Sequence, residues 1–202
     1  MRGLILAAGR GRRMGEITKE KPKCLIKIAG ITLLERQIMA FNESGITDIA
    51  IVTGYRSESL KTYKLVEFHN PNWKNTQMFR SLLCASDWLK HDNCIVSYSD
   101  IFYGSNILSK LQRSNSDVAV AYDPKWEELW AKRFDTPLLD AESFKMDNDK
   151  FVVELGNKVK SASEIQGQYM GLIYFTREGW NKLISMSSQI TLQMQDEIHM
   201  TD

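Results

Sequence analysis

The sequence lacks several features that mark common classes of protein. No apolar run reaches the roughly 18–20 residues that a membrane-spanning helix needs. The three cysteines are scattered without paired spacing, so they predict neither a disulfide framework nor a cysteine metal site. The three histidines are equally dispersed, which leaves no zinc-binding pattern. The composition of the whole sequence, with 43% apolar and 25% charged residues, is typical of a globular protein.

The length of 202 residues predicts one domain with a single large core. Because the net charge is only +1, the chain is not broadly basic, and we expect no nucleic-acid partner. The charge is unevenly placed, however: residues 1–30 carry +6 and the remainder −5. Such a local cluster favours a small polyanion as the ligand. The first apolar stretch is too short for a signal peptide, so we expect a cytoplasmic protein.

Apolar patterns predict alternating strands and helices through the first 120 residues. The expected strands are 3–8, 48–53, 93–99 and 117–122, and the expected helices are 31–44, 78–89 and 106–114. This alternation predicts an α/β fold with a mostly parallel three-layer sheet. Ligands on such sheets bind beyond the carboxyl ends of the strands.

The pattern changes beyond Pro124. Two strands joined by a turn at 147–149 are expected there, followed by a strand in 167–176 and a helix in 177–186. We therefore expect a single domain, residues 1–202, made of a parallel half at 1–122 and a smaller antiparallel half at 123–202.

Three glycines follow the first expected strand. Gly9 and Gly11 come directly after it, and Gly15 stands four residues later. Glycines at such a turn let main-chain N–H groups point at one anion with no side chain in the way. The spacing misses the dinucleotide fingerprint, and no G-K-[ST] follows, so this is not a Walker loop. Taken alone, the turn is equally consistent with an ordinary tight turn.

Cationic residues follow the glycine turn. Arg12 and Arg13 extend from it, and arginine can bind a phosphate through two hydrogen bonds. Pro22 fixes its own backbone and biases Lys21 toward an extended conformation, so Lys23 follows a rigid step. A solvated basic surface does not readily explain a strand, glycines, arginines and a fixed lysine in this order. A bound phosphate does.

The stretch LAAGRGRRMGEITKEKPKCLIKIAG resembles the signature of nucleotidyltransferases that activate sugar phosphates and related small phosphates. That signature reads L-A-A-G-x-G-x-R-(M/L), then a spacer, then K-P-K-x-(L/M). The resemblance implies a Rossmann-like fold of the nucleotide-diphospho-sugar transferase type, with residues 1–122 as the nucleotide-binding half. It implies catalytic roles for Arg13 on the β- and γ-phosphates and for Lys23 on the α-phosphate. The nucleotide-binding residues expected on this basis are Leu6, Ala7, Ala8, Gly9, Arg10, Gly11, Arg12, Arg13, Lys23, Gln77 and Ser81.

Further segments resemble the branch of this family that makes CDP-activated small phosphates and phosphonates. They are NPNWKNTQMFRSLLCASDWL, SYSDIFY, DAESFKMDNDKFVVELGNK and GQYMGLIYFT, and with the signature they cover most of residues 1–180. The branch includes phosphocholine and 2-aminoethylphosphonate cytidylyltransferases. One departure is Gln77, where that branch commonly has the asparagine of T-N-M. Its amide can still reach a base edge, but its greater length weakens the argument for cytosine.

Asp100 follows the strand expected at 93–99 and matches the family's metal-binding aspartate, which implies Mg²⁺ as cofactor. Because Mg²⁺ takes carboxylates, phosphate oxygens and water, one or two aspartates and a triphosphate suffice. On spacing alone, Asp100 could also cap a turn or helix. The family's second metal aspartate usually lies in a late W-x-E-x-D-like segment that this sequence does not show. Either the chain is shortened at its carboxyl end, or another residue serves, or the metal site is incomplete. The late acids are Asp196, Glu197 and Asp202.

The expected acceptor site lies in the second half of the chain. Its candidate residues are Asp123, Trp126, Trp130, Arg133, Glu142 and Tyr169. Aromatic faces and carboxylates suit an acceptor that carries an ammonium group. Trp126 and Trp130 stand four residues apart, however, so they could equally form one packed face of a helix. Packing is the commoner role for aromatic residues at such a spacing.

These observations predict transfer of CMP from CTP to a small phosphate or phosphonate, such as phosphocholine or 2-aminoethylphosphonate. One alternative is a sugar-1-phosphate nucleotidylyltransferase that uses UTP, dTTP or GTP. A second is a catalytically weakened homologue that only binds nucleotide. The expected partners are thus a nucleoside triphosphate and a small phosphorylated acceptor, with no nucleic acid and no membrane span. A homodimer is among the assemblies that the sequence leaves open.

Overall fold

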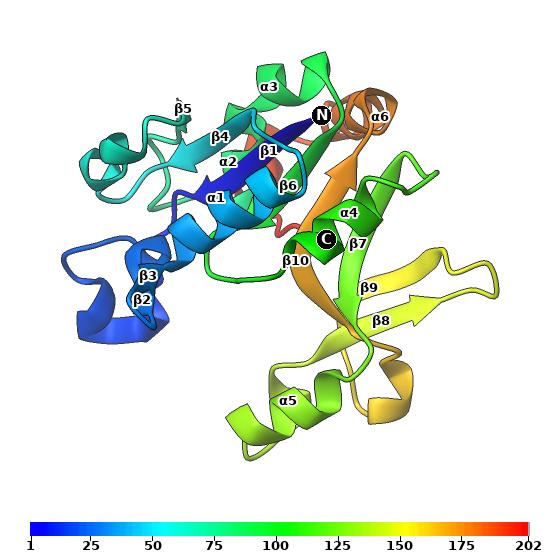
Figure 1. Cartoon of the computed structure of the whole chain (residues 1–202). Coiled ribbons are helices and arrows are strands. Elements are labelled where there is room, and N and C mark those ends of the chain that lie inside the picture. Colours follow the sequence, from blue (N-terminus) through cyan, green and yellow to red (C-terminus); the bar gives the residue numbers. More distant parts are fainter. Residues whose placement is uncertain (202) are drawn as a thin grey trace. The chain divides into compact units, whose positions relative to one another are not determined.

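The computed structural model describes residues 1–201, apart from the side chain of Arg13 (Figure 1). Within this part of the chain, the main sheet has six strands in the order β5-β4-β1-β6-β10-β7. The strands are β1 (Arg2–Ala7), β4 (Ile49–Thr53), β5 (Val66–His69), β6 (Cys94–Tyr98), β7 (Val118–Asp123) and β10 (Gln168–Phe175). β1 pairs in parallel with β4 and β6, and β5 pairs in parallel with β4, whereas β10 runs antiparallel to β6. The predicted mostly parallel α/β sheet is confirmed.

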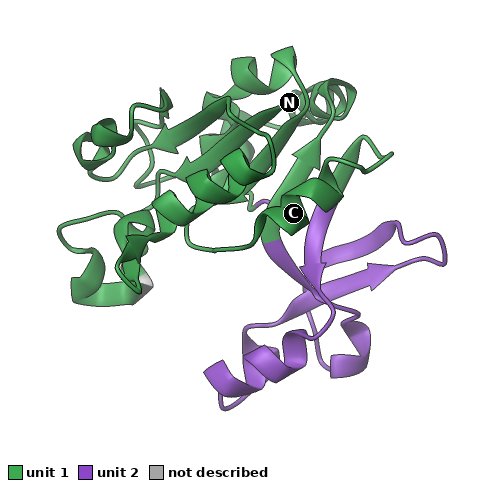
Figure 2. Cartoon of the chain, viewed as in Figure 1, with its two compact units in different colours: residues 1–119, 171–199 green, residues 120–170, 200–202 purple. Residues whose placement is uncertain are grey.

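The chain divides into two compact units (Figure 2). Unit 1 contains Met1–Ala119 and Gly171–His199, and unit 2 contains Val120–Met170 and the end of the chain from Met200. The sequence predicted a division at residue 122 with everything beyond it in one half. Residues 171–199 instead return to unit 1, because the second part of β10 pairs with β6.

The helices of unit 1 are α1 (Leu33–Glu43), α2 (Met78–Cys84), α3 (Ser86–His91), α4 (Ser105–Leu111), α6 (Arg177–Ser187) and α7 (Leu192–Glu197). In Figure 1, α1 and α4 lie in front of the sheet, and α2 lies behind it. Three 3₁₀ helices, η1 (Arg12–Thr18), η2 (Lys23–Leu25) and η3 (Ser57–Tyr63), and a small antiparallel pair, β2 (Lys27–Ile28) and β3 (Ile31–Thr32), complete the described elements of this unit.

Helix α1 shows how the sequence sets an element's limits. Thr32 and Glu35 form a reciprocal capping box, with distances of 2.7 Å from Thr32 N to Glu35 Oε2 and 3.1 Å from Glu35 N to Thr32 Oγ1. The hydrogen bonds that Glu35 Oε2 accepts from the N–H and from the hydroxyl of Thr32 lower the pKa of the Glu35 carboxyl. The fully buried Phe41 packs over β1, where a Cβ on Gly3 would lie 3.0 Å from its ring. Gly45, at φ 86°, ends the turn that follows the helix.

The prediction of a single helix at 78–89 is wrong in one respect, because the structure has two helices there. The N–H of Ala85 donates to the carbonyl of Leu82, three residues back instead of four. Ala85 also has a non-helical backbone, with φ −100° and ψ 21°. Helix α2 therefore ends at Cys84, and α3 begins at Ser86.

Unit 2 contains α5 (Trp126–Arg133), two 3₁₀ helices, η4 (Pro137–Leu139) and η5 (Ala162–Glu164), and the antiparallel strands β8 (Glu142–Met146) and β9 (Val152–Lys158). The turn between the strands is held by Asp147, whose Oδ1 accepts from the N–H groups of Asp149 and Phe151 at 3.0 and 2.9 Å. The predicted hairpin with its turn at 147–149 is confirmed. In the part of the chain that the structure describes, no helix has the length and apolar character needed to cross a membrane.

Candidate functional site

A pocket lies in unit 1 at the carboxyl ends of β1 and β6. Because these strands are parallel neighbours, the loops that follow them leave the same edge of the sheet. The pocket is lined by Leu6, Ala8, Gly9, Gly11, Lys23, Trp73, Thr76, Gln77, Met78, Ser81, Tyr98, Ser99 and Asp100. The glycine turn, the K-P-K lysine and the aspartate after β6 thus meet in one place.

The glycine turn leaves backbone open on the pocket side. A Cβ on Gly9 would meet no atom within 4 Å, so this position faces space that a ligand can fill. Gly11 has φ 70°, and a Cβ there would crowd the side chain of Lys23 at 3.1 Å. The fully buried Thr18 donates from Oγ1 to the carbonyl of Gly11 at 3.1 Å. The turn is therefore fixed from behind and open toward the pocket.

Lys23 is presented to the pocket by buried neighbours. Pro22 and Cys24 on either side are both buried, which anchors the chain while the lysine lies between them at the start of η2. Burial raises the pKa of the Cys24 thiol to about 12, and the charge of Asp100 adds to the rise. The thiol is therefore protonated at neutral pH and serves as packing.

The ammonium of Lys23 forms an ion pair with Asp100 inside the pocket. Its Nζ lies 2.6 Å from Asp100 Oδ2, and the two side chains are 28% and 37% exposed. Each group is thus satisfied by the other in this structure, while both remain accessible from the pocket. A phosphate would give the lysine a new partner, and a cation would do the same for the aspartate.

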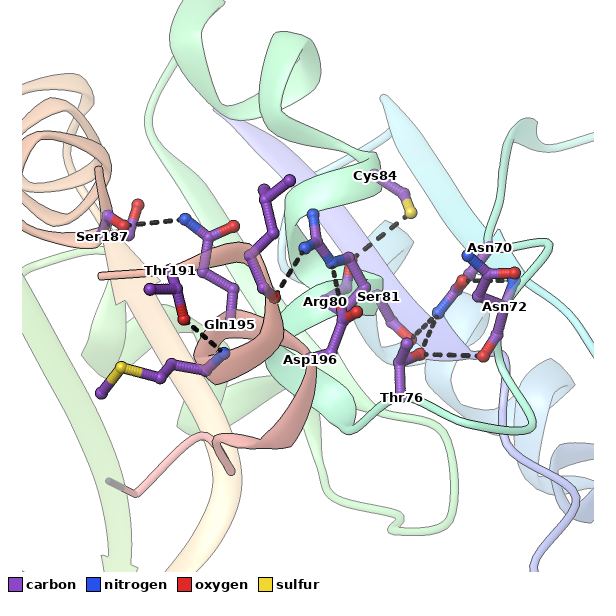
Figure 3. Close-up of polar contacts among 12 residues, drawn as sticks. Asn70, Asn72, Thr76, Arg80, Ser81, Cys84, Ser187, Thr191, Gln195 and Asp196 are labelled. Carbon is purple, nitrogen blue, oxygen red and sulfur yellow. Dashed lines mark hydrogen bonds and ion pairs between the residues drawn. The ribbon is translucent and has the colours of Figure 1, made fainter. Parts of the chain in front are cut away.

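A second wall of the pocket is built on a buried asparagine. Asn70, which is 1% exposed, donates from Nδ2 to Ser81 Oγ and to Thr76 Oγ1, both at 3.0 Å (Figure 3). Gln77 stands just before α2, with an extended backbone and an exposed side chain. Ser81 is buried one turn further along α2. The predicted residues Gln77 and Ser81 therefore line the same pocket as the glycine turn.

Trp73 lines the pocket but was not predicted from the sequence. Its ring meets Tyr55 edge to face, with 5.2 Å between centroids. Gly54 makes this possible, because a Cβ there would come within 2.7 Å of both Trp73 Cβ and the carbonyl oxygen of Ala8. The NPNW segment has no periodic pattern that distinguishes this tryptophan from a surface residue.

The remaining predicted nucleotide-binding residues have varied positions. Leu6 lines the pocket, whereas Ala7 is buried in β1 opposite Thr53. Arg10 lies over the ring of Tyr55, at 5.7 Å from its centroid. Arg12 is exposed at the start of η1. The side chain of Arg13 lies outside the described residues, so its predicted contact with phosphate stays a prediction.

The donor set for a metal is small. Among the described residues, no group of three or more His, Cys, Asp and Glu side chains could hold an ion. Asp100 in the pocket fits the prediction for magnesium, which can take its other oxygens from a triphosphate and water. Of the late acids, Asp196 pairs with Arg80 and Glu197 accepts from Gln193 Nε2 at 3.0 Å. Asp202 lies outside the described residues.

The predicted acceptor residues lie in unit 2, partly in its core. Trp126 and Trp130 are only 4% and 9% exposed and pack edge to face in a cluster with Ala141 and Ile165. The guanidinium of Arg133 lies 5.2 Å from the Trp130 ring centroid. The tryptophans thus form the packed face that the sequence offered as the other interpretation of their spacing.

The other three candidates are not in this cluster. Asp123 ends β7, and its Oδ1 accepts from the N–H of Lys125 at 2.8 Å. Glu142 is exposed at the start of β8, and Tyr169 is half-buried in β10. The role of all six residues in binding an acceptor stays a prediction.

A pocket at the carboxyl edge of a mostly parallel sheet, lined by a glycine turn, a lysine and an aspartate, is the arrangement expected of an α/β protein that binds a phosphorylated ligand. More particularly, residues 3–141 match the MobA-like NTP transferase domain, so the chain belongs to this family of nucleotidyltransferases. The predicted family and enzyme class are confirmed. The matched range includes the glycine turn, Lys23, the Gln77–Ser81 wall and Asp100.

The chain is also similar to individual members of this class. It is 35% identical over 195 residues to the CTP:phosphoglutamine cytidylyltransferase of Campylobacter jejuni, covering 92% of this chain and 77% of that protein. Its fold matches the CTP:phosphocholine cytidylyltransferase of Streptococcus pneumoniae, with a TM-score of 0.68 and 20% identity over 93% of this chain and 76% of the other. It also matches the inositol-1-phosphate CTP transferase of T. maritima, with a TM-score of 0.77 and 15% identity over 98% and 77%. The two structural matches support the fold alone.

Proposed function

We propose that this protein transfers CMP from CTP to a small phosphate or phosphonate acceptor and releases pyrophosphate. The ion pair between Lys23 and Asp100, beside the open turn at Gly9, is the observation that supports the proposal most strongly. It brings a cation for phosphate and a carboxylate for a metal into one pocket, from positions 77 residues apart. The similarity to a CTP-dependent cytidylyltransferase with a phosphorylated acceptor supports the choice of CTP.

The chemistry needs charge compensation more than a base. An acceptor oxygen attacks the α-phosphorus, a new P–O bond forms, and the bond to the leaving pyrophosphate breaks. Because the attacking oxygen is already anionic, no general base is required. Lys23 would leave Asp100 and hold the α-phosphate, while Arg13 would hold the outgoing phosphates. Asp100 would then be free to hold Mg²⁺, which supplies positive charge to the triphosphate when bound.

The wall formed by Gln77 and Ser81 is the proposed site for the base. A glutamine amide offers both donors and an acceptor, and a serine hydroxyl offers one donor and two acceptor lone pairs. Ser81 Oγ already accepts a hydrogen bond from Asn70 Nδ2, and this contact orients the Ser81 hydroxyl. Cytosine presents an amino donor next to ring acceptors, and this set of groups can satisfy both. We also propose that the enzyme acts in the cytoplasm.

A panel of substrates tests the proposal. Pyrophosphate release would be measured with CTP, UTP, dTTP and GTP, each combined with phosphocholine, 2-aminoethylphosphonate, phosphoglutamine or glucose-1-phosphate. We expect release with CTP and one of the first three acceptors, and only in the presence of Mg²⁺. Release confined to glucose-1-phosphate with another nucleotide would contradict the proposal, and so would nucleotide binding without release.

A further inference from the structure

Helix α7 lies far from the glycine turn in the sequence, and no sequence pattern predicted it. Thr191 caps it by accepting from Met194 N at 3.2 Å. Gln195 is buried and donates from Nε2 to the carbonyl of Ser187, at the end of α6, at 2.8 Å. Figure 3 shows these contacts on one side of α7, with Asp196 on the side that meets α2. The short helix is therefore held firmly in unit 1.

Asp196 contacts α2 through two different groups. Its carboxylate forms an ion pair with the Nε of Arg80, and its carbonyl accepts from the N–H of Gln77 at 2.7 Å. Arg80 reaches α7 a second time, donating from Nη2 to the carbonyl of Leu192 at 3.2 Å (Figure 3). Three polar contacts thus join the start of α2 to α7.

These contacts bear directly on the pocket wall. Gln77 and Ser81 stand one helical turn apart and both line the pocket, whereas Arg80 between them pairs with α7. Gln77 directly precedes α2, so its N–H has no acceptor one turn back in the helix. The carbonyl of Asp196 accepts this hydrogen bond instead. Both members of the ion pair are partly buried, which makes such a pair stronger than an exposed one.

We propose that Arg80 and Asp196 form a clamp that fixes the start of α2 and thereby sets the position of Gln77 toward the nucleobase. They are positioning residues for nucleotide recognition, and this inference rests on the proposed function. It also gives Asp196 a role other than that of a second metal ligand. The clamp acts on nucleotide affinity and base choice, and leaves the phosphate chemistry at Lys23 unchanged.

The test compares Arg80→Ala, Asp196→Ala and the double variant with the wild-type enzyme. We expect the KM for CTP, and the Kd for CTP measured by calorimetry, to rise about five- to tenfold in each single variant, and no further in the double variant. The preference for CTP over UTP falls, while kcat stays within about twofold. Arg80→Lys, which keeps the charge, gives an intermediate KM. Lys182→Ala, which removes an ion pair with Asp117 elsewhere in unit 1, leaves the KM unchanged.

Other outcomes would overturn the clamp. If wild-type enzyme binds CTP but the variants only melt at lower temperature with unchanged KM and Kd, the contacts are merely structural. If Asp196→Ala loses kcat by a hundredfold or more and recovers it at high Mg²⁺, Asp196 is a metal ligand instead. If the wild-type protein binds no CTP, the proposed function fails and the clamp fails with it. The first two results leave the proposed function standing.

Discussion

In unit 1 most of the residues predicted for the nucleotide line one pocket, whereas in unit 2 the residues predicted for the acceptor are divided between a packed core and the surface. Lys23 and Asp100 meet at 2.6 Å and remain accessible. Trp126 and Trp130 also meet, but they are buried with Ala141 and Ile165. Proximity is therefore no sufficient sign of a site. The pocket differs from the core because its charged side chains remain accessible and have few other partners.

The difference arises because these residue types are not equally useful for packing a core. A lysine fixed between buried neighbours and a glycine at positive φ have no obvious use in packing, so together they indicate a ligand. A tryptophan contributes to a core wherever it is buried, so its presence at helical spacing indicates little beyond packing. Four expected changes test this contrast.

The largest effect is expected from Trp126→Ala in unit 2. Because this side chain is 4% exposed in the cluster, its loss should lower the free energy of unfolding by about 3–5 kcal/mol. Chemical denaturation would measure this, with Trp126→Phe as the matched variant that keeps an aromatic ring and loses less. Unchanged stability with a raised KM for the acceptor would reverse the contrast and make Trp126 a binding residue.

Lys23→Ala should affect activity and spare the fold. The loss of one preorganised cation typically lowers the rate by ~10²–10³, and we expect a fall of this size in kcat for pyrophosphate release. Lys19→Ala is the matched control, because that lysine is 58% exposed and pairs only with Glu16 among the described side chains. Equal activity in the two variants would remove Lys23 from the reaction.

The two glycines of the turn should respond differently to alanine. Gly9→Ala places a methyl group in open pocket space, so we expect unchanged stability and nucleotide binding weaker by roughly 1–3 kcal/mol. Gly11→Ala forces a side chain into φ 70°, which should lower stability by about 1–2 kcal/mol. Thermal unfolding and calorimetric binding of CTP separate these outcomes. A destabilised Gly9→Ala variant with normal binding would contradict the assignment of that space to the ligand.

The smallest effect concerns an ion pair outside both sites. A hydrogen bond from Lys182 lowers the pKa of the Asp117 carboxyl most, and a hydrogen bond from Thr176 lowers it further. Because the folded-state pKa lies below the unfolded one, the stabilisation is present above the unfolded pKa and is lost as the pH falls through the folded pKa. Lys182→Ala should therefore raise the pKa of Asp117 in an NMR titration and flatten the loss of thermal stability below about pH 4. An unmoved titration would show that the pair does not form in solution.

Much of the fold was predictable from local sequence, because β1 and β4 are nearly continuous apolar runs and a capping box begins α1. The glycine turn and Lys23 were predictable for the same local reason. Trp73 and the support that Asn70 gives Ser81 were not, since both depend on residues brought together by folding. Likewise, the separation of α2 from α3 at Ala85 follows from one shifted hydrogen bond that no apolar period reveals.

The division of the chain was only partly predictable. The change of pattern near Pro124 indicated a second part, and unit 2 begins at Val120. The return of residues 171–199 to unit 1 depends on the pairing of β10 with β6, a contact between distant segments. The contacts between α2 and Asp196 are of the same kind, and they make the late chain part of the pocket's support.

The most direct test of the central claim is the affinity for CTP of Asp100→Asn, measured by calorimetry with and without Mg²⁺. If Lys23 exchanges Asp100 for the α-phosphate, this variant should bind CTP more tightly than the wild-type protein in EDTA, because its lysine is already free and a nearby negative charge is gone. With Mg²⁺ it should be nearly inactive in pyrophosphate release. Weaker binding in EDTA together with normal activity in Mg²⁺ would contradict the account.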